Sequence, residues 1–487
     1  MNYMKRIDNL IGSTPVAVVC NAAGQVVRSL TCDSREVSAG SCFFAVTGTA
    51  ADGHRFIPQA VAAGAVAVVC QQLPETLAEG VCYVAVADTH AAMADMAAAF
   101  YGYPSRELKL VGITGTNGKT TTVTLLYDLV RALGYKAGLV STVVYKIDGR
   151  EIEATHTTPD PIRLNAMMRE MADAGCEFCF MECSSHAIVQ ERTRGLDFAG
   201  GIFSNITHDH LDYHKTFAEY IRAKKLFFDG LPKGAFVLTN ADDRNGRVMV
   251  QNTAAAVSTY SLRAMVDFRC KIVEMHLDGM LLRIDGQELW VGLLGRFNAY
   301  NLLAVYGAAV LLGLDRSEVL RVLSVLHAVS GRFEKVRAAN GTTAIVDYAH
   351  TPDALENVIQ TIGEIRTPGQ QLIVVCGCGG DRDRTKRPEM AQIAVKYAST
   401  AIFTSDNPRH ESPEAILDDM VAGLDPGVRY LRIADRAEAI RTAVMLSRPG
   451  DILLIAGKGH ETYQIVGDVK HHFDDREEVR KSFELLN

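Results

Sequence analysis

The sequence predicts an α/β fold divided into three domains. The chain has 487 residues, and domains commonly contain about 150 residues, so three is the expected number. Hydrophobic residues make up 48% of the chain and charged residues 22%, which leaves enough apolar surface to build folded cores. Short apolar runs alternate with amphipathic segments, and each run leads into a polar or glycine-bearing loop. This alternation is typical of mainly parallel sheets with helices on both faces.

Two breaks in this pattern define the expected domains, which are residues 1–103, 104–334 and 335–487. The first break is the Tyr103-Pro104 step, and the second lies in VSGRFEKV. Buried strands are expected in the second domain within residues 108–114, 136–142, 177–184, 198–206 and 234–243. The third domain repeats the pattern, with apolar runs that start at 343, 371, 400 and 451. Ligands of such sheets bind beyond the carboxyl ends of the strands, so the loops after these runs are the expected sites.

The charge balance and the termini argue against several classes of protein. The 50 basic and 57 acidic residues give a formal net charge of −7, whereas general nucleic-acid binders usually carry a basic excess. The chain has no apolar run of about 20 residues and no signal-peptide pattern at its start. We therefore expect a cytoplasmic, monomeric protein with neither a nucleic-acid partner nor membrane insertion.

The eleven cysteines are expected to be reduced and buried. Their number is odd, and most of them lie inside apolar runs. The pair Cys176 and Cys179 has the spacing of a redox or zinc half-site. This alternative has no second Cys pair to complete it.

The strongest local signal is LKLVGITGTNGKTTTVTLLYDLVRALG, which predicts a strand over 108–114, a glycine turn and a helix from about Lys119. Gly115 and Gly118 allow backbone amides to approach phosphate oxygens, and the start of the helix adds its positive dipole end. Lys119 supplies a charge for the outer phosphates and Thr120 a hydroxyl for Mg²⁺. The strict motif would require glycine at position 113, where this chain has Ile113. A structural glycine turn with a solvated lysine is the alternative.

A lysine in the middle of an apolar helix face is the second signal. In HKTFAEYIRAKKLFFDG, helical spacing places Phe217, Tyr220, Ile221 and Phe228 on one face, with Lys224 in its centre. Burial favours the neutral amine, which can act as a base or nucleophile or react with CO₂ to form a carbamate. The alternative is that the lysine extends out of the helix toward solvent.

Acidic and histidine side chains follow two of the expected strands. Glu182 ends a buried strand, where an acid can hold Mg²⁺ opposite a phosphate loop. NITHDHLDYH places His208, Asp209, His210, Asp212 and His214 within seven residues, which are candidate ligands of a divalent cation. A purely structural histidine loop is the alternative.

The loops of the last domain combine arginines with an acid. Arg382, Arg384, Lys386 and Arg387 follow the run at 371, DNPR (406–409) follows the run at 400, and GKGHE (457–461) follows the run at 451. An arginine fork suits a carboxylate and a nearby glutamate suits an ammonium group, so these loops together suit an amino acid. A solvated charge run is the alternative for the first of them.

These residues occur in motifs that resemble those of the Mur ligases of peptidoglycan synthesis. The matching motifs, in chain order, are GTNGKTT, TTPD, MECSSHA, SNITHDHLDYH, the AK of EYIRAKKLF, GRFNAYN, GRFEKV, DYAHTPD, GGDRDRTKRP, DNPRHESP and AGKGHE. They cover essentially the whole chain, which makes the set far more specific than any single motif. The family's phosphate loop reads G-T-x-G-K-[ST], which accounts for Ile113.

The resemblance implies a UDP-sugar-binding N-terminal domain, a central phosphate-loop ATPase domain and a Rossmann-like C-terminal domain that binds an amino acid. It also implies an ATP-dependent ligase that works with Mg²⁺. The γ-phosphate of ATP would pass to the D-Glu side chain of UDP-N-acetylmuramoyl-L-alanyl-D-glutamate to form an acyl phosphate. The amine of meso-diaminopimelate would then displace the phosphate and form an amide.

Each residue role that follows is implied by the resemblance. The catalytic residues would be Lys119, Glu182, His210 and Lys224. The metal ligands would be Thr120 and Glu182 for one Mg²⁺, and His210 with Lys224, modified to N6-carboxylysine, for a second. The ATP-binding residues would be Thr114, Gly115, Thr116, Asn117, Gly118, Lys119, Thr120, Asn301, Asp347 and His350. The residues for the UDP-sugar dipeptide would be Cys32, Ser34, Thr49, Ala50, Ala51, His156, Thr157, Thr158, Ser184, Gln190 and Arg192. The diaminopimelate residues would be Arg382, Asp406, Asn407, Pro408, Arg409, Gly457 and Glu461.

Three other functions remain as alternatives. The same reaction with L-lysine is disfavoured by Arg409, which can pair with the second carboxylate that only diaminopimelate carries. A folylpolyglutamate synthase is disfavoured by DNPR and GKGHE. A nucleotide-binding scaffold without catalysis is disfavoured because Lys119, Glu182, His210 and Lys224 are all present.

Overall fold

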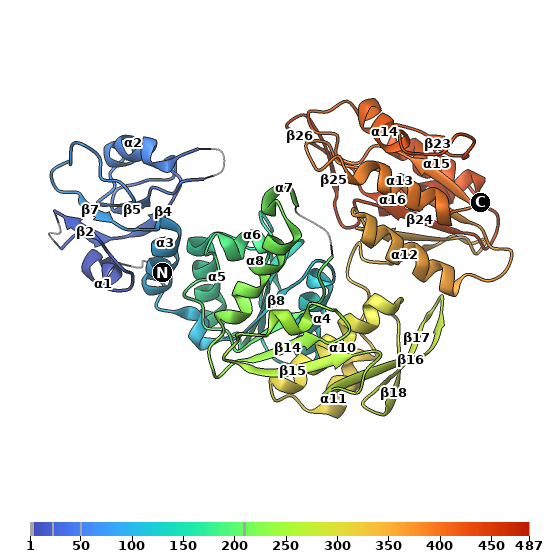
Figure 1. The fold of residues 1–487 in the computed structure, drawn as a ribbon, viewed down its shortest axis with the longest axis horizontal. Helices are drawn as coiled ribbons and strands as arrows, with labels where there is room; N and C mark the ends of the chain where they lie inside the picture. The colour runs from blue at the N-terminus through green and yellow to red at the C-terminus, as the bar shows by residue number, and fades with distance from the viewer. Residues whose placement is uncertain (1–3, 22–23, 49–50, 208–210, 487) are drawn as a thin grey trace.

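The computed structural model describes residues 4–21, 24–48, 51–207 and 211–486. Figure 1 shows three α/β domains, the blue N-terminal one at one end, the C-terminal one in orange and red at the other, and the central one between them. The predicted fold class and the three-domain organisation are confirmed. Within the described residues, no helix is both long and apolar enough to cross a membrane.

The N-terminal domain has a five-stranded sheet. Its spatial order is β2 (Val18–Cys20), β7 (Cys82–Ala85), β6 (Ala67–Cys70), β5 (Ser41–Phe44) and β4 (Ser29–Thr31). Helices α1 (Ile7–Ile11) and α3 (Thr89–Phe100) cover one face, and α2 (Ile57–Ala62) covers the other. A two-stranded pair, β1 (Lys5–Arg6) and β3 (Val26–Val27), lies beside this sheet.

The central domain has an eleven-stranded sheet with β8 (Lys109–Thr114) in its middle. The spatial order is β11 (Arg150–Glu153), β10 (Val144–Ile147), β9 (Ala137–Val140), β12 (Phe178–Glu182), β8, β13 (Gly200–Phe203), β14 (Phe236–Asn240), β15 (Ala256–Ser261), β16 (Phe268–His276), β17 (Gly279–Ile284) and β18 (Gln287–Val291). The strands from β9 to β16 in this order are parallel, and the two ends of the sheet are antiparallel. Every strand expected between 108 and 243 is present.

Helices cover both faces of the central sheet. One face packs against α4 (Lys119–Ala132), α10 (Arg296–Leu311) and α11 (Arg316–Leu323). The other face packs against α5 (Pro161–Asp173) and α8 (Phe217–Asp229). Three short helices, α6 (Ser185–Val189), α7 (Leu211–His214) and α9 (Gly246–Met249), lie in loops of the same domain.

The C-terminal domain has a six-stranded sheet of Rossmann type. Its order is β19 (Glu334–Arg337), β20 (Thr343–Asp347), β24 (Ile452–Ala456), β21 (Leu372–Cys376), β22 (Thr400–Phe403) and β23 (Leu431–Arg432), and only β19 is antiparallel to its neighbour. Helices α12 (Pro352–Ile365), α13 (Lys386–Tyr397) and α14 (Pro413–Val421) cover one face, and α15 (Arg436–Leu446) and α16 (Asp475–Glu484) cover the other. A hairpin of β25 (Tyr463–Val466) and β26 (Val469–His472) precedes α16. The four apolar runs expected here form the four central strands.

The cysteines agree with the sequence analysis. All eleven are free thiols, and nine of them are buried. Cys176 and Cys179 lie in the core beneath the central sheet, which argues against a redox or zinc site there.

Candidate active site

The loop between β8 and α4 has the shape of a phosphate loop. Helix α4 begins at Lys119, as the sequence predicted, and Gly118 has a φ of 88°. A Cβ atom at Gly118 would lie 2.4 Å from Asn301 Oδ1, and one at Gly115 would lie 2.0 Å from Ser204 Oγ. Only glycine fits at these two positions, and their missing side chains keep the backbone open to a phosphate.

Two residues that the sequence analysis did not assign hold this loop in place. Asn205 accepts hydrogen bonds from Thr116 N (2.8 Å, backbone O) and from Asn117 N (2.9 Å, Oδ1). Ser204 Oγ donates to the carbonyl of Asn117 at 2.7 Å. Both residues follow β13, the neighbour of β8 in the sheet. The sequence signals for them are their place at the end of the expected strand over 198–206 and at the start of the motif SNITHDHLDYH.

Lys119 lies over the loop that it follows. Its Nζ donates to the carbonyls of Gly115 (2.9 Å) and Thr116 (2.8 Å). The ammonium group and the start of α4 therefore point to the same place, where both favour an anion.

Glu182 ends β12, on the other side of β8, and has the environment of a metal ligand. It is 1% exposed. Its Oε1 accepts from Thr120 Oγ1 (2.8 Å), Thr142 N (2.8 Å) and Thr142 Oγ1 (3.1 Å). Its Oε2 is buried and has no hydrogen-bond partner among the described residues. Because an unpaired buried carboxylate oxygen is costly, this donor set fits Mg²⁺, with Thr120 beside it.

Lys224 is buried under the phosphate loop, so the solvated alternative is wrong. Its side chain is on the buried face of α8 and is 1% exposed. The Nζ atom donates to the carbonyl of Gly115 at 2.8 Å and lies 4.6 Å from the centre of the Tyr220 ring. The helical pattern placed Lys224 on the apolar face and left open whether its side chain extends to solvent. The tertiary structure decides for burial and adds the contact with the loop.

The histidine cluster is only partly described. His208, Asp209 and His210 lie outside the described residues. His214 is buried, and its Nε2 lies 2.9 Å from Ser185 Oγ. Within the described part of the chain, no group of three or more His, Cys, Asp or Glu side chains is arranged to hold a metal ion. The assignment of His210 as a metal ligand remains a prediction.

Most residues assigned to the muramoyl-dipeptide gather around Arg192. Its Nη1 donates to the carbonyl of Thr158 at 2.6 Å, and its Nε and Nη2 donate to Gln190 Oε1 at 3.1 and 2.7 Å. Thr158 Oγ1 donates to the backbone of Glu182 at 2.7 Å and accepts from Ser184 N at 3.2 Å. Burial lowers the pKa of Arg192, and the charge of Asp160 acts in the opposite direction. Through Thr158 this group is joined to the backbone of Glu182.

Two further residues of this set lie close by. Thr157 Oγ1 accepts from Thr142 Oγ1 at 3.1 Å, which links it to the Glu182 site. The backbone N of His156 donates to Tyr145 Oη at 3.1 Å, and burial followed by the charge of Arg192 lowers the His156 pKa.

The residues of the N-terminal domain that were assigned to the UDP-sugar dipeptide are less completely described. Cys32 is exposed, and Ser34 Oγ donates to Gln59 Oε1 at 3.4 Å. Ala51 is exposed, while Thr49 and Ala50 lie outside the described residues.

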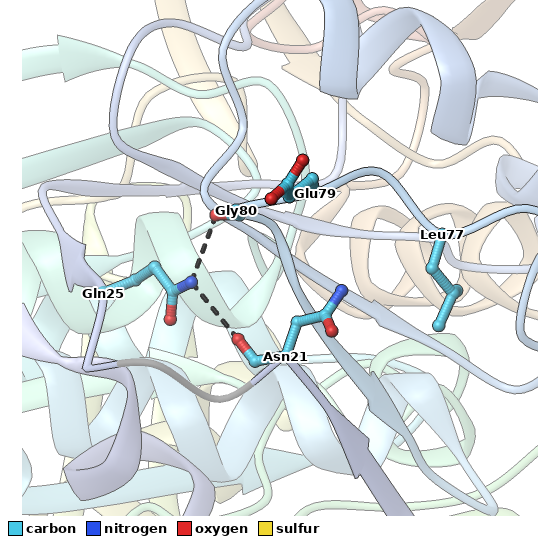
Figure 2. A pocket seen from close by; sticks show the side chains of 5 residues that line it. All are labelled: Asn21, Gln25, Leu77, Glu79 and Gly80. Atoms are coloured by element: carbon cyan, nitrogen blue, oxygen red, sulfur yellow. Dashed lines mark hydrogen bonds between the residues drawn. The ribbon is translucent and has the colours of Figure 1, made fainter.

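A separate hollow of about 430 Å³ in this domain is lined by Asn21, Gln25, Leu77, Glu79 and Gly80 (Figure 2). Gln25 Nε2 donates there to the carbonyls of Asn21 and Gly80. No predicted site residue lines this hollow, and the lining residues include no cation for a phosphate.

The remaining residues assigned to ATP lie on the central and C-terminal domains, which meet in a seam at the phosphate loop. Asn301 faces Gly118, and its Oδ1 accepts from Thr122 Oγ1 at 3.5 Å. Asp347 Oδ2 accepts from Phe333 N at 2.7 Å, and burial raises the pKa of its carboxyl group. His350 is exposed, and its Nδ1 lies 2.8 Å from the carbonyl of Tyr348.

Arg332 is a site residue that the sequence analysis did not name. Its Nη2 donates to Thr120 Oγ1 at 3.4 Å across the seam, and its guanidinium carbon lies 4.6 Å from the centre of the Tyr348 ring. The signal available in the sequence was its place in the GRFEKV motif at the expected domain break.

The loops after β22 and β24 form a polar cluster that suits an ammonium group. Asn407 Nδ2 donates to Glu461 Oε2 at 2.9 Å. Lys458, which was not predicted, is fully buried and donates from Nζ to Glu461 Oε2 (2.9 Å) and Asn407 Oδ1 (3.1 Å). Burial and the charge of Asp406 raise the pKa of Glu461, while Lys458 acts in the opposite direction. A Cβ atom at Gly457 would lie 2.6 Å from Asp406 Oδ2, so the two loops touch at that glycine.

Arg382 and Arg409 lie at the edge of the same cluster. Arg409 Nη1 donates to the carbonyl of Gly380 at 2.8 Å, which joins the DNPR loop to the loop after β21. Pro408 is buried between them, and its carbonyl would lie 1.9 Å from a Cβ atom at Gly380. Arg382 is exposed beside these residues.

Arg387 is not part of a solvated charge run, because its side chain is fully buried against Glu411 and Asp419. Its guanidinium group is the main reason that the pKa of Glu411 is lowered to about 2.

Comparisons with known proteins show which family the chain resembles along its whole length. The Mur ligase middle domain matches residues 113–309, the glutamate ligase domain of Mur ligases matches 331–459, and the catalytic domain of the Mur ligase family matches 26–101. Two relatives named UDP-N-acetylmuramoyl-L-alanyl-D-glutamate–2,6-diaminopimelate ligase are each 54% identical. The one from Phocaeicola vulgatus aligns over 98% of this chain and 99% of its own, and the one from Bacteroides fragilis over 99% and 100%. A solved structure of a ligase with the same name superposes with a TM-score of 0.70 at 33% identity, covering 100% of this chain and 99% of that one.

Proposed function

Because the chain belongs to the Mur ligase family, we propose that it is an ATP-dependent ligase of peptidoglycan synthesis. It joins meso-diaminopimelate to UDP-N-acetylmuramoyl-L-alanyl-D-glutamate. The observation that carries the proposal is the whole-length similarity to ligases of that name. The geometry of the site supports it. A phosphate loop and an acid beside it lie at the seam between the second and third domains, and the loops of the third domain form a polar cluster that suits an amino acid.

In the first step the phosphate loop holds ATP while its γ-phosphate passes to the D-Glu side chain. The open backbone around Gly115 and Gly118 and the start of α4 receive the phosphates. Lys119 Nζ and Arg332 balance charge that develops on the transferred group. The carboxylate oxygen of D-Glu forms a bond to phosphorus, the bond to the ADP oxygen breaks, and the product is an acyl phosphate.

The metal-binding part of the proposal assigns Mg²⁺ to Thr120 and to Glu182 Oε2. A bound Mg²⁺ would neutralise phosphate charge during the transfer. His210 and Lys224 as a carbamate would hold a second ion, because a carbamate turns the buried amine into an anion. The burial of Lys224 and its contact with Gly115 support that assignment.

In the second step the amine of diaminopimelate attacks the acyl carbon. The new C–N bond forms, the C–O bond to phosphate breaks, and the attacking neutral amine loses one proton and keeps the other, which gives the amide and inorganic phosphate. Asp406, Asn407 and Glu461 suit the ammonium group at the far end of the amino acid, and Arg409 and Arg382 suit the carboxylate beside it.

Phosphate release from ATP tests the proposal. The purified chain is incubated with UDP-N-acetylmuramoyl-L-alanyl-D-glutamate and with meso-diaminopimelate, L-lysine or no amino acid. We expect turnover that depends on diaminopimelate and is far weaker with L-lysine. Equal turnover with L-lysine and diaminopimelate would overturn the proposed specificity. If neither amino acid stimulated turnover, the result would favour a non-catalytic nucleotide-binding scaffold.

Arg409→Ala supplies a second arm of this experiment. Losing a charged partner of a carboxylate should raise the KM for diaminopimelate by about tenfold or more. Arg441→Ala is the matched control, because Arg441 pairs with Glu438 on the surface of α15. An unchanged KM in Arg409→Ala would remove this residue from the carboxylate site.

A further inference from the structure

A fully buried ion pair lies directly beneath the two loops, after β22 and β24, that form the polar cluster of Asn407, Lys458 and Glu461. Arg436 is the first residue of α15 and Asp475 the first residue of α16, and the side chains of both are 0% exposed. Arg436 Nε and Nη2 donate to Asp475 Oδ1 and Oδ2, both at 2.7 Å. This forked geometry fixes the guanidinium plane.

The remaining donors of Arg436 reach the last carbonyls before both loops. Its Nη2 donates to the carbonyl of Ala456 at 3.1 Å, and its Nη1 donates to that of Ser405 at 3.4 Å. Ala456 ends β24 and precedes Gly457, while Ser405 follows β22 and precedes Asp406. One guanidinium group therefore links the residues that immediately precede the DNPR and GKGHE loops.

The charge of Arg436 also acts on the loops themselves. Burial by itself lowers the pKa of Arg436, but the charge and hydrogen bonds of Asp475, with the charge of Asp406, raise it above its ordinary value. A Cβ atom at Gly457 would lie 2.6 Å from Asp406 Oδ2 and 3.8 Å from Arg436 Nη2. Asp406 and the guanidinium thus meet at the point where the two loops touch.

We propose that Arg436, oriented by Asp475, is a positioning residue that sets the spacing between the DNPR and GKGHE loops for the incoming amino acid. This inference rests on the proposed function, which places diaminopimelate between these loops. Stability alone is a weak reason for such a pair, because well-packed apolar residues often replace buried ion pairs at little cost. The contacts with Ser405 and Ala456 give the pair a role that apolar residues would not supply.

The test uses the double variant Arg436→Met/Asp475→Leu in the full chain. Removing both charges leaves no unpaired buried ion, so we expect a folded protein that melts near the wild-type temperature. The two loop carbonyls lose their donor, and a shift of about 1 Å in the loops is expected to raise the KM for diaminopimelate by about tenfold or more. The KM for ATP and for the UDP-sugar should stay within about twofold, because the residues assigned to them lie on other loops.

Two controls separate positioning from stability. Val479→Ala creates a cavity in α16, one turn beyond Asp475, and should lower the melting temperature without changing the KM for diaminopimelate. Arg436→Lys keeps the charge but not the fork, so its KM should lie between those of the wild type and the double variant.

A wild-type KM for diaminopimelate in the folded double variant would overturn the inference, as would an equal rise in all three KM values. If the double variant does not fold, the isosteric variant Asp475→Asn replaces it. The test is then whether the KM for diaminopimelate rises relative to the KM values for ATP and the UDP-sugar. Failure of the proposed function is distinguishable, because the wild type would then show no turnover with diaminopimelate. If the wild type used L-lysine instead, the same ratio would be measured with L-lysine.

Discussion

Glu182 combines burial with an unused oxygen, and this environment indicates a function beyond packing. Three donors satisfy Oε1, whereas Oε2 has no partner in the described part of the chain. We predict that Glu182→Gln lowers kcat by about 10²–10³-fold, because the amide keeps the shape but loses the negative charge that Mg²⁺ requires. Phosphate release as a function of Mg²⁺ concentration measures the effect.

Glu177→Gln is the matched control for Glu182→Gln. Glu177 is exposed just before the same strand, β12, so the same change in charge there should leave kcat near the wild-type value. Wild-type activity and Mg²⁺ dependence in Glu182→Gln would contradict its role as a metal ligand.

Lys224 and Lys225 are adjacent on α8 but have different partners. Lys224 contacts the phosphate loop through Gly115, and Lys225 forms an ion pair with Asp229 on the same helix. We predict that Lys224→Ala abolishes phosphate release and that added bicarbonate does not restore it, because alanine has no amine to form the carbamate. Lys225→Ala should retain near-normal release, and comparable activity of the two variants would refute the carbamate role.

His460 should make the stability of the protein depend on pH. Burial, followed by the charges of Arg332 and Arg476, lowers its pKa to about 3. The unfolded chain therefore binds a proton below about pH 6.5 that the folded chain does not, and stability falls as the pH decreases through that window. We predict that the urea midpoint drops less between about pH 7 and about pH 5.5 in His460→Gln than in the wild type.

His276→Gln serves as the reference variant, because His276 is exposed at the end of β16. It should show the wild-type pH dependence. If the urea midpoint of His460→Gln fell with decreasing pH as steeply as that of the wild type, His460 would not account for the loss of stability.

Two glycines flank helix α4, and substituting them separates the effect of a steric clash at the phosphate loop from the effect of backbone strain. Gly118 precedes it and Gly134 follows it, and both have positive φ values. At Gly118 an added Cβ would lie 2.4 Å from Asn301 Oδ1, whereas at Gly134 it would meet no atom within 4 Å. We predict that Gly118→Ala raises the KM for ATP by at least about tenfold, because the loop and Asn301 must separate.

Gly134→Ala has the same backbone strain without the clash. It should cost about 1 kcal/mol of stability and leave the KM for ATP unchanged. Equal KM values in the two variants would show that the approach of Asn301 to the loop does not matter for ATP.

The last four strands of the central sheet show where prediction from local patterns stopped. No strand was expected between 243 and 334, yet β15, β16, β17 and β18 lie there. Residues of β16 alternate between buried and exposed positions instead of forming one apolar run. Our strand signal was the continuous apolar run of a strand buried on both faces, so a half-exposed strand gave none.

At the scale of the whole molecule, the contact between the central and C-terminal domains passes through the phosphate loop. Asp353, in the first turn of α12, accepts from Asn117 Nδ2 at 2.8 Å and from Thr207 Oγ1 at 3.3 Å. We predict that Asp353→Ala raises the KM for ATP by about five- to tenfold, because losing these bonds removes roughly 1–1.4 kcal/mol of support for the loop. Steady-state phosphate release measures the change.

Glu356→Ala is the control for this contact. Glu356 lies on the same helix but bonds Tyr397 within its own domain. The KM for ATP should therefore not change in this variant, and an equal rise in both variants would assign the effect to α12 instead of the seam.

The sequence by itself determined the fold class, the phosphate loop and the order of the active-site motifs. It could do so because glycine turns, apolar runs and helical spacing are local properties of the chain. In this way Lys224 was placed on the apolar face that it shares with Tyr220 and Phe228, although its burial was decided by the tertiary structure.

Only the tertiary structure decided which side chains meet. Ser204, Asn205, Arg332 and Lys458 escaped prediction, and so did the pair of Arg436 and Asp475. Each of them has a hydrogen-bond partner in a loop or helix that is distant in sequence. A sheet brings the carboxyl ends of separate strands to one edge, and the sequence does not state which strands become neighbours. The chemistry of each residue is thus readable from the chain, whereas its partners follow from the order of the strands.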